Sequence, residues 1–192
     1  MTDTTSWWRK LWQPTKNKWL LFLPTGAFIA ILFGITSVHA YYFVFDYSNR
    51  NELCYSCHIG MDTIVEEYEQ SVHFQNNLGI QAQCSDCHVP KEFFPKLKTK
   101  ILALGDVYHM AVGTYTLENW EENRVHLSQI AYEKIKEVDS STCKSCHNPD
   151  DWGTNMQPAR ARLNHNPARW VERGETCVDC HKGVAHLRPV IK

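Results

Sequence analysis

The longest uninterrupted apolar stretch lies near the amino terminus, where no charged side chain occurs between Trp19 and Phe45. A helix needs about 20 predominantly apolar residues to cross the hydrocarbon core of a bilayer. Tryptophans gather before the stretch, and Tyr41 and Tyr42 lie near its end, as in interfacial aromatic belts. The pattern predicts one transmembrane helix over residues 19–45, with Pro24 inside its first turns.

The polar segment 1–18 carries four basic side chains and one acid. Because basic flanks are retained in the cytoplasm, we expect segment 1–18 to be cytoplasmic and residues 46–192 to lie outside. A cleaved signal peptide ending at Val38-His39-Ala40 is the alternative interpretation. The apolar run is about twice as long as the 7–15 residues of a signal-peptide h-region, which favours an uncleaved signal anchor.

Beyond residue 46, apolar residues recur with the period of helices rather than of strands. One helical face is formed by Met61, Ile64, Val65, Tyr68 and Val72. The pattern predicts further helices at about 95–110, at about 117–138 with Thr116 as its cap, and at about 158–165. No strand-like alternation longer than a few residues occurs. We therefore predict a mainly α fold, with a single transmembrane helix followed by a small domain of helices and loops.

One pentapeptide, Cys-x-x-Cys-His, occurs four times, at residues 54–58, 84–88, 143–147 and 177–181. It is the attachment signature of c-type haem, in which two thiols add to the vinyl groups of one porphyrin and the adjacent imidazole binds the iron. The motifs use every cysteine of the chain: Cys54, Cys57, Cys84, Cys87, Cys143, Cys146, Cys177 and Cys180. Disulfides or structural zinc would not require a histidine after every second cysteine. The sequence therefore predicts four covalently bound haem c groups.

Residues 46–192 form a small domain for four haems. The porphyrins must therefore supply much of its core, and we expect the apoprotein not to fold stably. A net charge of −1 indicates that nucleic acid is not a partner. The lipid bilayer is a predicted partner, because of the apolar stretch near the amino terminus.

Each motif histidine is predicted to supply one axial iron ligand: His58, His88, His147 and His181. Among the remaining histidines, His73 and His165 occupy matched places between two motifs, and His186 follows the fourth motif. We predict that these three are distal ligands, because bis-histidine ligation closes the iron to substrate and suits electron transfer. His109 could serve as a fourth.

Three distal histidines for four irons indicate that one haem differs from the others. Met61, three residues after His58, could give the first haem a thioether ligand, which would raise its reduction potential relative to bis-histidine ligation. Met61 is also the first apolar residue of the helix predicted there. Its assignment as ligand or as core residue stays open at this point.

An internal duplication is visible in the order of motifs and free histidines. Each half of the domain holds two motifs with one free histidine between them. Two diverged copies of a dihaem unit, over about residues 50–110 and 139–190, explain this order better than four independent sites.

Three segments carry a resemblance to a known family. They are Ser71-Val72-His73-Phe74 with Asn76, Cys84-Ser85-Asp86-Cys87-His88-Val89-Pro90, and Thr176-Cys177-Val178-Asp179-Cys180-His181-Lys182-Gly183-Val184-Ala185-His186. With its anchor and four motifs, the whole chain resembles the NapC/NirT family of membrane-anchored tetrahaem quinol dehydrogenases. The resemblance implies oxidation of menaquinol or ubiquinol and electron delivery to a periplasmic reductase or cytochrome in anaerobic respiration. It also implies a single-pass protein of the bacterial inner membrane with its haem domain in the periplasm.

The resemblance further implies that the first haem is the unusual one, with a methionine ligand. Family members commonly place that methionine two residues after the motif histidine, whereas here Ile59 and Gly60 precede Met61. Either Met61 or His58 is therefore the expected iron ligand of the first haem.

An acidic residue near the open face of that haem is also implied, beside the quinol pocket, and by motif it is Asp106. Lys98, Leu102 and Asp106 share one i, i+4 stripe of a predicted helix. Asp106 would accept a quinol proton while Lys98, or alternatively Lys100, orients the hydroxyl. A solvated amphipathic face is the plainer interpretation of the same stripe.

Two other functions compete with quinol oxidation. The protein could be a passive anchored relay that receives electrons from another protein and has no quinol site. It could also be a terminal reductase acting at an open haem. The sequence offers no cluster of catalytic Lys, Tyr and His around a lysine-ligated haem, which argues against the reductase.

Overall fold

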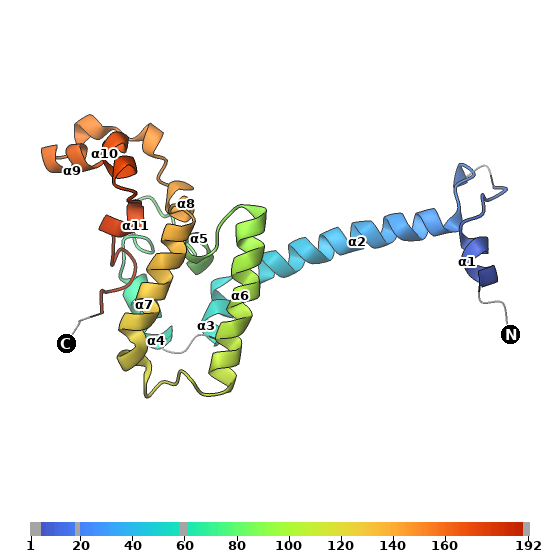
Figure 1. The fold of residues 1–192 in the computed structure, drawn as a ribbon, viewed down its shortest axis with the longest axis horizontal. Helices are drawn as coiled ribbons and strands as arrows, with labels where there is room; N and C mark the ends of the chain where they lie inside the picture. Colours follow the sequence, from blue (N-terminus) through green and yellow to red (C-terminus); the bar gives the residue numbers. More distant parts are fainter. Residues whose placement is uncertain (1–4, 18–19, 58–60, 190–192) are drawn as a thin grey trace. The chain divides into compact units, whose positions relative to one another are not determined.

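The structure, a computed structural model, describes residues 5–17, 20–57 and 61–189. The described residues form helices, turns and loops without a strand (Figure 1), so the predicted mainly α class is confirmed. Two compact units divide the chain, an N-terminal unit of residues 1–48 and a C-terminal unit of residues 49–192. All four motifs lie in the C-terminal unit.

The N-terminal unit holds α1 (Thr5–Leu11) and the long apolar helix α2 (Thr25–Tyr47). Among the described residues, α2 is the helix long and apolar enough to cross a membrane. Pro24 stands before its first turn with φ −62° and ψ 144°, not within the first turns as the sequence predicted. Proline has no N–H and disfavours a helical residue before it, so the helix begins after it.

The segment between α1 and α2 folds back onto the first turn of α2. A Cβ atom at Gly26 would lie 3.0 Å from the carbonyl oxygen of Leu11 and 3.1 Å from the Trp12 ring. The Thr15 hydroxyl also donates to the carbonyl of Leu23, at 3.1 Å. A side chain at position 26 would push the ring away, so glycine allows this close approach.

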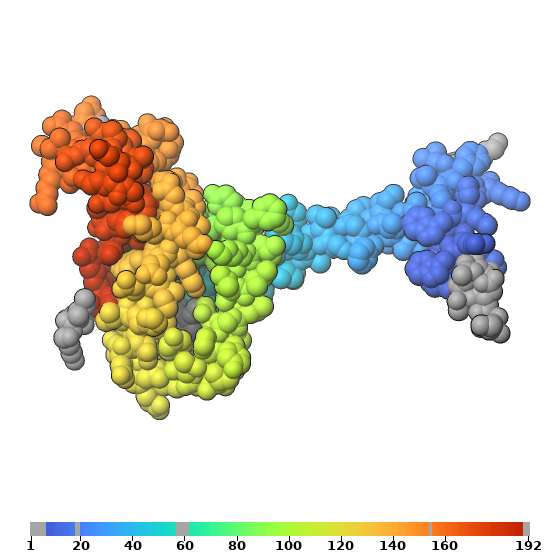
Figure 2. All heavy atoms as spheres, in the orientation of Figure 1, coloured from blue at the N-terminus to red at the C-terminus, as the bar shows by residue number. Residues whose placement is uncertain are grey.

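Two longer helices, α6 (Phe93–Ala111) and α7 (Trp120–Glu137), belong to the C-terminal unit, where Figure 2 shows them in green and yellow. An ion pair between Lys98 and Glu137 joins them. The sequence predicted both helices, but it placed the start of the second one too early. Thr116 and Asn119 instead exchange hydrogen bonds in a turn that precedes α7, at 2.8 and 3.3 Å, so the helix starts after Asn119.

The remaining helices are short. They are α3 (Asn51–Cys57), α4 (Met61–Glu69), α5 (Cys84–His88), α8 (Ser141–Lys144), η2 (Pro149–Asp151), η3 (Thr154–Met156), α9 (Ala159–Asn164), α10 (Pro167–Glu172) and α11 (Cys177–Cys180). The predicted helix at 158–165 corresponds to α9. The helix predicted over 61–72 ends earlier, at Glu69, because the chain turns at Ser71 and then winds around Asn76. The Asn76 side chain accepts hydrogen bonds from the backbone of Leu78 and Ile80 at 3.0 and 3.3 Å.

Side-chain packing supplies little of the interior. Among the described residues, the buried large apolar side chains are Tyr68 and Val178, each 6% exposed. On α6, Ile101, Leu104 and Tyr108 remain largely exposed. So few buried side chains cannot stabilise a domain of this length by themselves. The observation agrees with the expectation that porphyrins form much of the core.

Candidate haem and quinol sites

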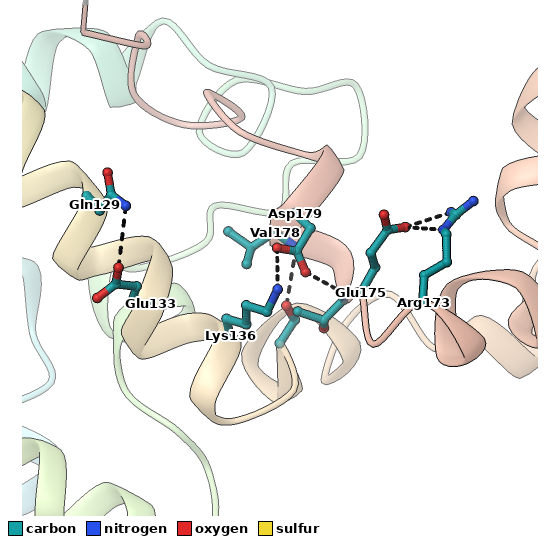
Figure 3. Close-up of polar contacts among 9 residues, drawn as sticks. Gln129, Glu133, Lys136, Arg173, Glu175, Val178 and Asp179 are labelled. Carbon is teal, nitrogen blue, oxygen red and sulfur yellow. Dashed lines mark hydrogen bonds and ion pairs between the residues drawn. The ribbon is translucent and has the colours of Figure 1, made fainter.

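The second and fourth motifs form helical turns that their own aspartates cap. Asp86 accepts a hydrogen bond from the backbone N–H of Gln83, and Asp179 accepts one from that of Thr176, both at 2.8 Å. Each carboxylate also forms an ion pair with a lysine: Asp86 with Lys91 at 2.5 Å, and Asp179 with Lys136 at 2.8 Å. Figure 3 shows the pair between Lys136 and Asp179. The hydrogen bond from Lys136 lowers the pKa of Asp179 below its ordinary value. The third residue of these motifs therefore fixes the turn that carries the thiols.

The first and third motifs have serine at the same position and use it differently. The Ser56 hydroxyl donates to the carbonyl of Leu53 at 2.8 Å, and the Ser145 hydroxyl donates to that of Thr142 at 2.7 Å. Odd and even motifs thus alternate in local structure. The duplication of a dihaem unit stays a prediction.

The third and fourth motifs are joined through Ser140, which precedes α8. Ser140 is fully buried and adopts a left-handed conformation, with φ 49° and ψ 33°. Its hydroxyl accepts a hydrogen bond from the backbone N–H of Val178 at 3.3 Å. This contact sets the fourth motif against the third.

Replacing Ser140 by valine is expected to destabilise the protein by about 2 to 4 kcal/mol, because a β-branched residue is strained at positive φ and the hydrogen bond to Val178 is lost. Ser140→Gly removes the same hydrogen bond but tolerates the backbone conformation. Thermal unfolding followed by circular dichroism should give a lower midpoint for the valine variant than for the glycine variant. Equal midpoints would mean that the backbone conformation at Ser140 is not the constraint described here.

Among the described residues of the C-terminal unit, three pairs of histidine rings lie close together. The ring centroids are 6.1 Å apart for His73 and His147, 6.3 Å for His88 and His186, and 5.9 Å for His165 and His181. Each pair joins one motif histidine to one of the three free histidines that the sequence selected. A nitrogen ligand binds its metal at about 2 Å, so two imidazoles on opposite sides of one iron have ring centres about 6 Å apart. The spacing of each pair therefore fits one iron.

The pairs exchange histidines between the two halves of the domain. His73, from the first half, faces the third motif, and His186, from the end of the second half, faces His88 of the second motif. His165 pairs within its own half. Two of the three pairs therefore link the first half of the domain to the second.

Hydrogen bonds set the orientation of two free histidines. His73 Nδ1 lies 3.2 Å from the carbonyl oxygen of Val184, and His165 Nδ1 lies 2.7 Å from the side-chain oxygen of Gln157. A ring that donates from Nδ1 has Nε2 left to bind a metal. Burial lowers the pKa of His186, which favours the neutral imidazole that a metal requires.

The structure describes only part of the first motif. His58 and the side chains of Cys57 and Met61 lie outside the described residues, so the ligands of the first haem stay predictions. A hydrogen bond with the Cys84 thiol and, to a lesser extent, the Lys100 cation together lower the pKa of Cys54 to about 6. The first and second motifs therefore lie side by side, with Lys100 near the first.

The three quinol-site candidates differ in their surroundings on α6. Lys98 is exposed and paired with Glu137 of α7. Lys100 is half-buried, and this burial lowers its pKa. Asp106 is exposed and makes no hydrogen bond or ion pair with the described residues. Of the two lysines, Lys100 is the one close to the first motif.

His109 stands apart from the histidine pairs. Its Nδ1 lies 3.3 Å from the Thr114 hydroxyl, and its ring contacts Tyr108 and Tyr115. Within the part of the chain that the structure describes, it faces no motif histidine. Its use as a fourth distal ligand stays a prediction, because His58, the motif histidine without a described pair, lies outside the described residues.

A family model for the N-terminal region of NapC/NirT cytochromes c matches residues 15–191. The chain belongs to the NapC/NirT cytochrome c family. It is therefore a membrane-anchored c-type cytochrome that transfers electrons. No solved structure matches it.

Several relatives of this NapC/NirT protein are similar over most of its length. A protein of Allochromatium vinosum, provisionally described as a tetraheme cytochrome-c type, is 45% identical over 157 residues, covering 81% of this chain and 84% of that protein. The cytochrome c-type protein NapC of Escherichia coli is 35% identical over 182 residues, covering 94% of this chain and 90% of that protein. The cytochrome c-type protein TorC of the same species is 35% identical, but this chain covers only 46% of it.

Several residues that shape the sites of this NapC/NirT protein were not found from the sequence. Aspartate at the same position of the second and fourth motifs was a usable signal for the capping turns. Gln157 and Ser140 carry no such signal, because each acts through a contact with a distant or irregular part of the chain. Glu67 and Arg124, described below, are likewise ordinary charged residues in the sequence.

Proposed function

We propose that this protein is a tetrahaem quinol dehydrogenase of the bacterial inner membrane. It oxidises menaquinol or ubiquinol at the periplasmic side and delivers the electrons to a periplasmic reductase or cytochrome. The observation that carries the proposal is the set of three histidine pairs, with ring centroids 5.9–6.3 Å apart. Such pairs are suited to electron transfer and unsuited to substrate chemistry at the iron.

Four thiol pairs, one from each motif, would attach four haems. The three histidine pairs would ligate the second, third and fourth, and His58 or Met61 would ligate the first. When bound, each haem stores and releases one electron without adding a substrate to a bis-histidine iron. The chain's own contribution is to hold each imidazole in a fixed orientation, as Val184 does for His73 and Gln157 does for His165.

Quinol oxidation also releases two protons, so the site needs a proton acceptor near the first haem. The exposed carboxylate of Asp106 on α6 is the proposed acceptor. Lys100, half-buried near Cys54, is the better candidate for orienting the quinol hydroxyl. Lys98 is the weaker one, because its ammonium group is paired with Glu137.

The test is to mix the oxidised, detergent-solubilised protein anaerobically with a reduced menaquinone analogue and to follow the haem absorption bands. Quinol should reduce the haems within the time of catalytic turnover, and a quinol-site inhibitor should block the reaction. Reduction by dithionite but not by quinol would instead show a passive relay. Turnover of nitrite or hydroxylamine at a high-spin haem would indicate a terminal reductase.

A further inference from the structure

The segment that follows the fourth motif, Val184 to Leu187, contacts two of the histidine pairs. His186 faces His88 at 6.3 Å between ring centroids. The carbonyl oxygen of Val184 lies 3.2 Å from Nδ1 of His73, which in turn faces His147. One short irregular segment therefore supplies a ring to one pair and an orienting carbonyl to another.

Apolar packing does not hold this segment in place. The side chain of Leu187 is 68% exposed and that of Val184 is 45% exposed. Neither residue buries enough apolar surface to fix a backbone. Ala185 and His186 are only partly buried, so polar contacts to the backbone are needed to fix the segment.

Two charged side chains make those contacts. The backbone N–H of Leu187 donates to Glu67 Oε2 at 2.8 Å, and Arg124 Nη2 donates to the carbonyl of Leu187 at 3.2 Å. Arg124 Nη2 also lies 2.6 Å from both carboxylate oxygens of Glu67. The two side chains thus bind each other and both backbone groups of Leu187.

This pair is shielded from solvent, unlike the other ion pairs described. The side chains of Arg124 and Glu67 are 13% and 12% exposed. Charge-assisted hydrogen bonds are shorter and stronger than neutral ones, and low exposure limits competition from water. The contact can therefore hold a backbone segment whose side chains are exposed or only partly buried.

The pair also ties the segment to two helices from different parts of the chain (Figure 1). Glu67 comes from α4, next to Tyr68, which is buried and donates its hydroxyl to the carbonyl of Ala82. Arg124 comes from the first turns of α7. The anchoring groups are therefore part of the folded framework.

We propose that Glu67 and Arg124 form a clamp on the backbone of Leu187 that positions His186 opposite His88 and Val184 beside His73. The inference rests on the proposed function, because it takes the histidine pairs to be haem ligands. Glu67 and Arg124 are positioning residues, because they act on His186 through the backbone of Leu187 and do not ligate the iron. Their removal frees His186 and opens one axial position on the second haem.

The clamp is tested on the purified tetrahaem protein with Glu67→Ala and Arg124→Ala. Carbon monoxide binding to the reduced protein counts irons with an open axial position. Low-temperature EPR of the oxidised protein counts low-spin haems. Each variant should keep four haems by intact mass, bind one more equivalent of carbon monoxide than the parent, and lose one low-spin signal. Added imidazole should restore that signal.

Glu121→Gln is the matched control. Glu121 lies 3.6 Å from Arg124 Nη1 and is 68% exposed, but it makes no contact with Leu187 among the described residues. The control should keep the parent's carbon monoxide stoichiometry and EPR spectrum. Should Glu67→Ala or Arg124→Ala fail to accumulate, Glu67→Gln and Arg124→Lys give the same readouts, with partial opening of one haem expected.

Unchanged carbon monoxide binding and EPR in the Glu67 and Arg124 variants would overturn the clamp. So would an equal change in Glu121→Gln, which would point to general destabilisation. His186→Ala separates the clamp from the ligand assignment. If that variant opens one haem while the clamp variants open none, only the clamp is wrong; if it opens none, His186 is not a ligand and the assignment fails with it.

Discussion

Replacing Cys143 and Cys146 together by alanine is expected to leave the protein without a stably folded haem domain. These thiols belong to the third motif, whose helix α8 packs against α5 of the second motif. The described chain buries only two large apolar side chains, Tyr68 and Val178. A domain with so small a side-chain core depends on its prosthetic groups for stability. Loss of one haem should therefore also disrupt the neighbouring haem sites.

Intact mass, haem staining and thermal unfolding measure this outcome. The double variant should yield little haem-containing protein of full length, and what is recovered should be degraded readily by protease. Ser145→Ala is the control within the same motif. It removes only the hydroxyl that donates to Thr142 and should keep four haems. A double variant that carries three haems and unfolds at the parent's temperature would contradict the role of the haems as core.

Replacing Asp106 by asparagine is expected to slow quinol-driven haem reduction by about 10²-fold or more, the range for loss of a positioned general base. Asparagine keeps the size of the side chain but cannot accept the quinol proton. Dithionite reduction should be unchanged, because it requires no proton acceptor at this site. Stopped-flow absorption with a reduced menaquinone analogue gives both rates.

Two comparisons sharpen this prediction. Glu122→Gln removes an exposed carboxylate of α7 that has no place in the proposed quinol site, and its rate should equal the parent's. Lys100→Met should slow the reaction more than Lys98→Met, because Lys100 lies near Cys54 while Lys98 is paired with Glu137. An Asp106→Asn protein that reacts with quinol at the parent's rate would remove Asp106 from the mechanism.

The sequence predicted the longer helices α2, α6 and α7, but not the short helices α1, α3, α5, α8, α10 and α11. The haem motifs could be recognised because their signal is local. Helical periodicity is visible in residues that are close in sequence. The two cysteines that attach one porphyrin also lie within the same five-residue motif. The ends of helices were predicted less well. Pro24 precedes α2 rather than bending it, and the turn between Thr116 and Asn119 delays the start of α7.

The pairing of histidines could not be predicted from the sequence, although its three free members are the histidines that the sequence proposed as distal ligands. His73 and His147 come from different halves, and nothing near either residue specifies the other. The duplication would have favoured pairs within each half, as for His165 and His181. The tertiary packing of the elements decides which histidines pair. Contacts such as the Glu67–Arg124 clamp join residues far apart in sequence, so no local sequence pattern indicates them.

A redox titration followed by EPR on the purified, detergent-solubilised protein tests most directly the claim that each histidine pair holds one iron. The account predicts at least three low-spin haems with bis-imidazole signals and a fourth haem, that of the first motif, with a distinct signal and potential. Fewer than three bis-imidazole signals in a protein that carries four haems would contradict it.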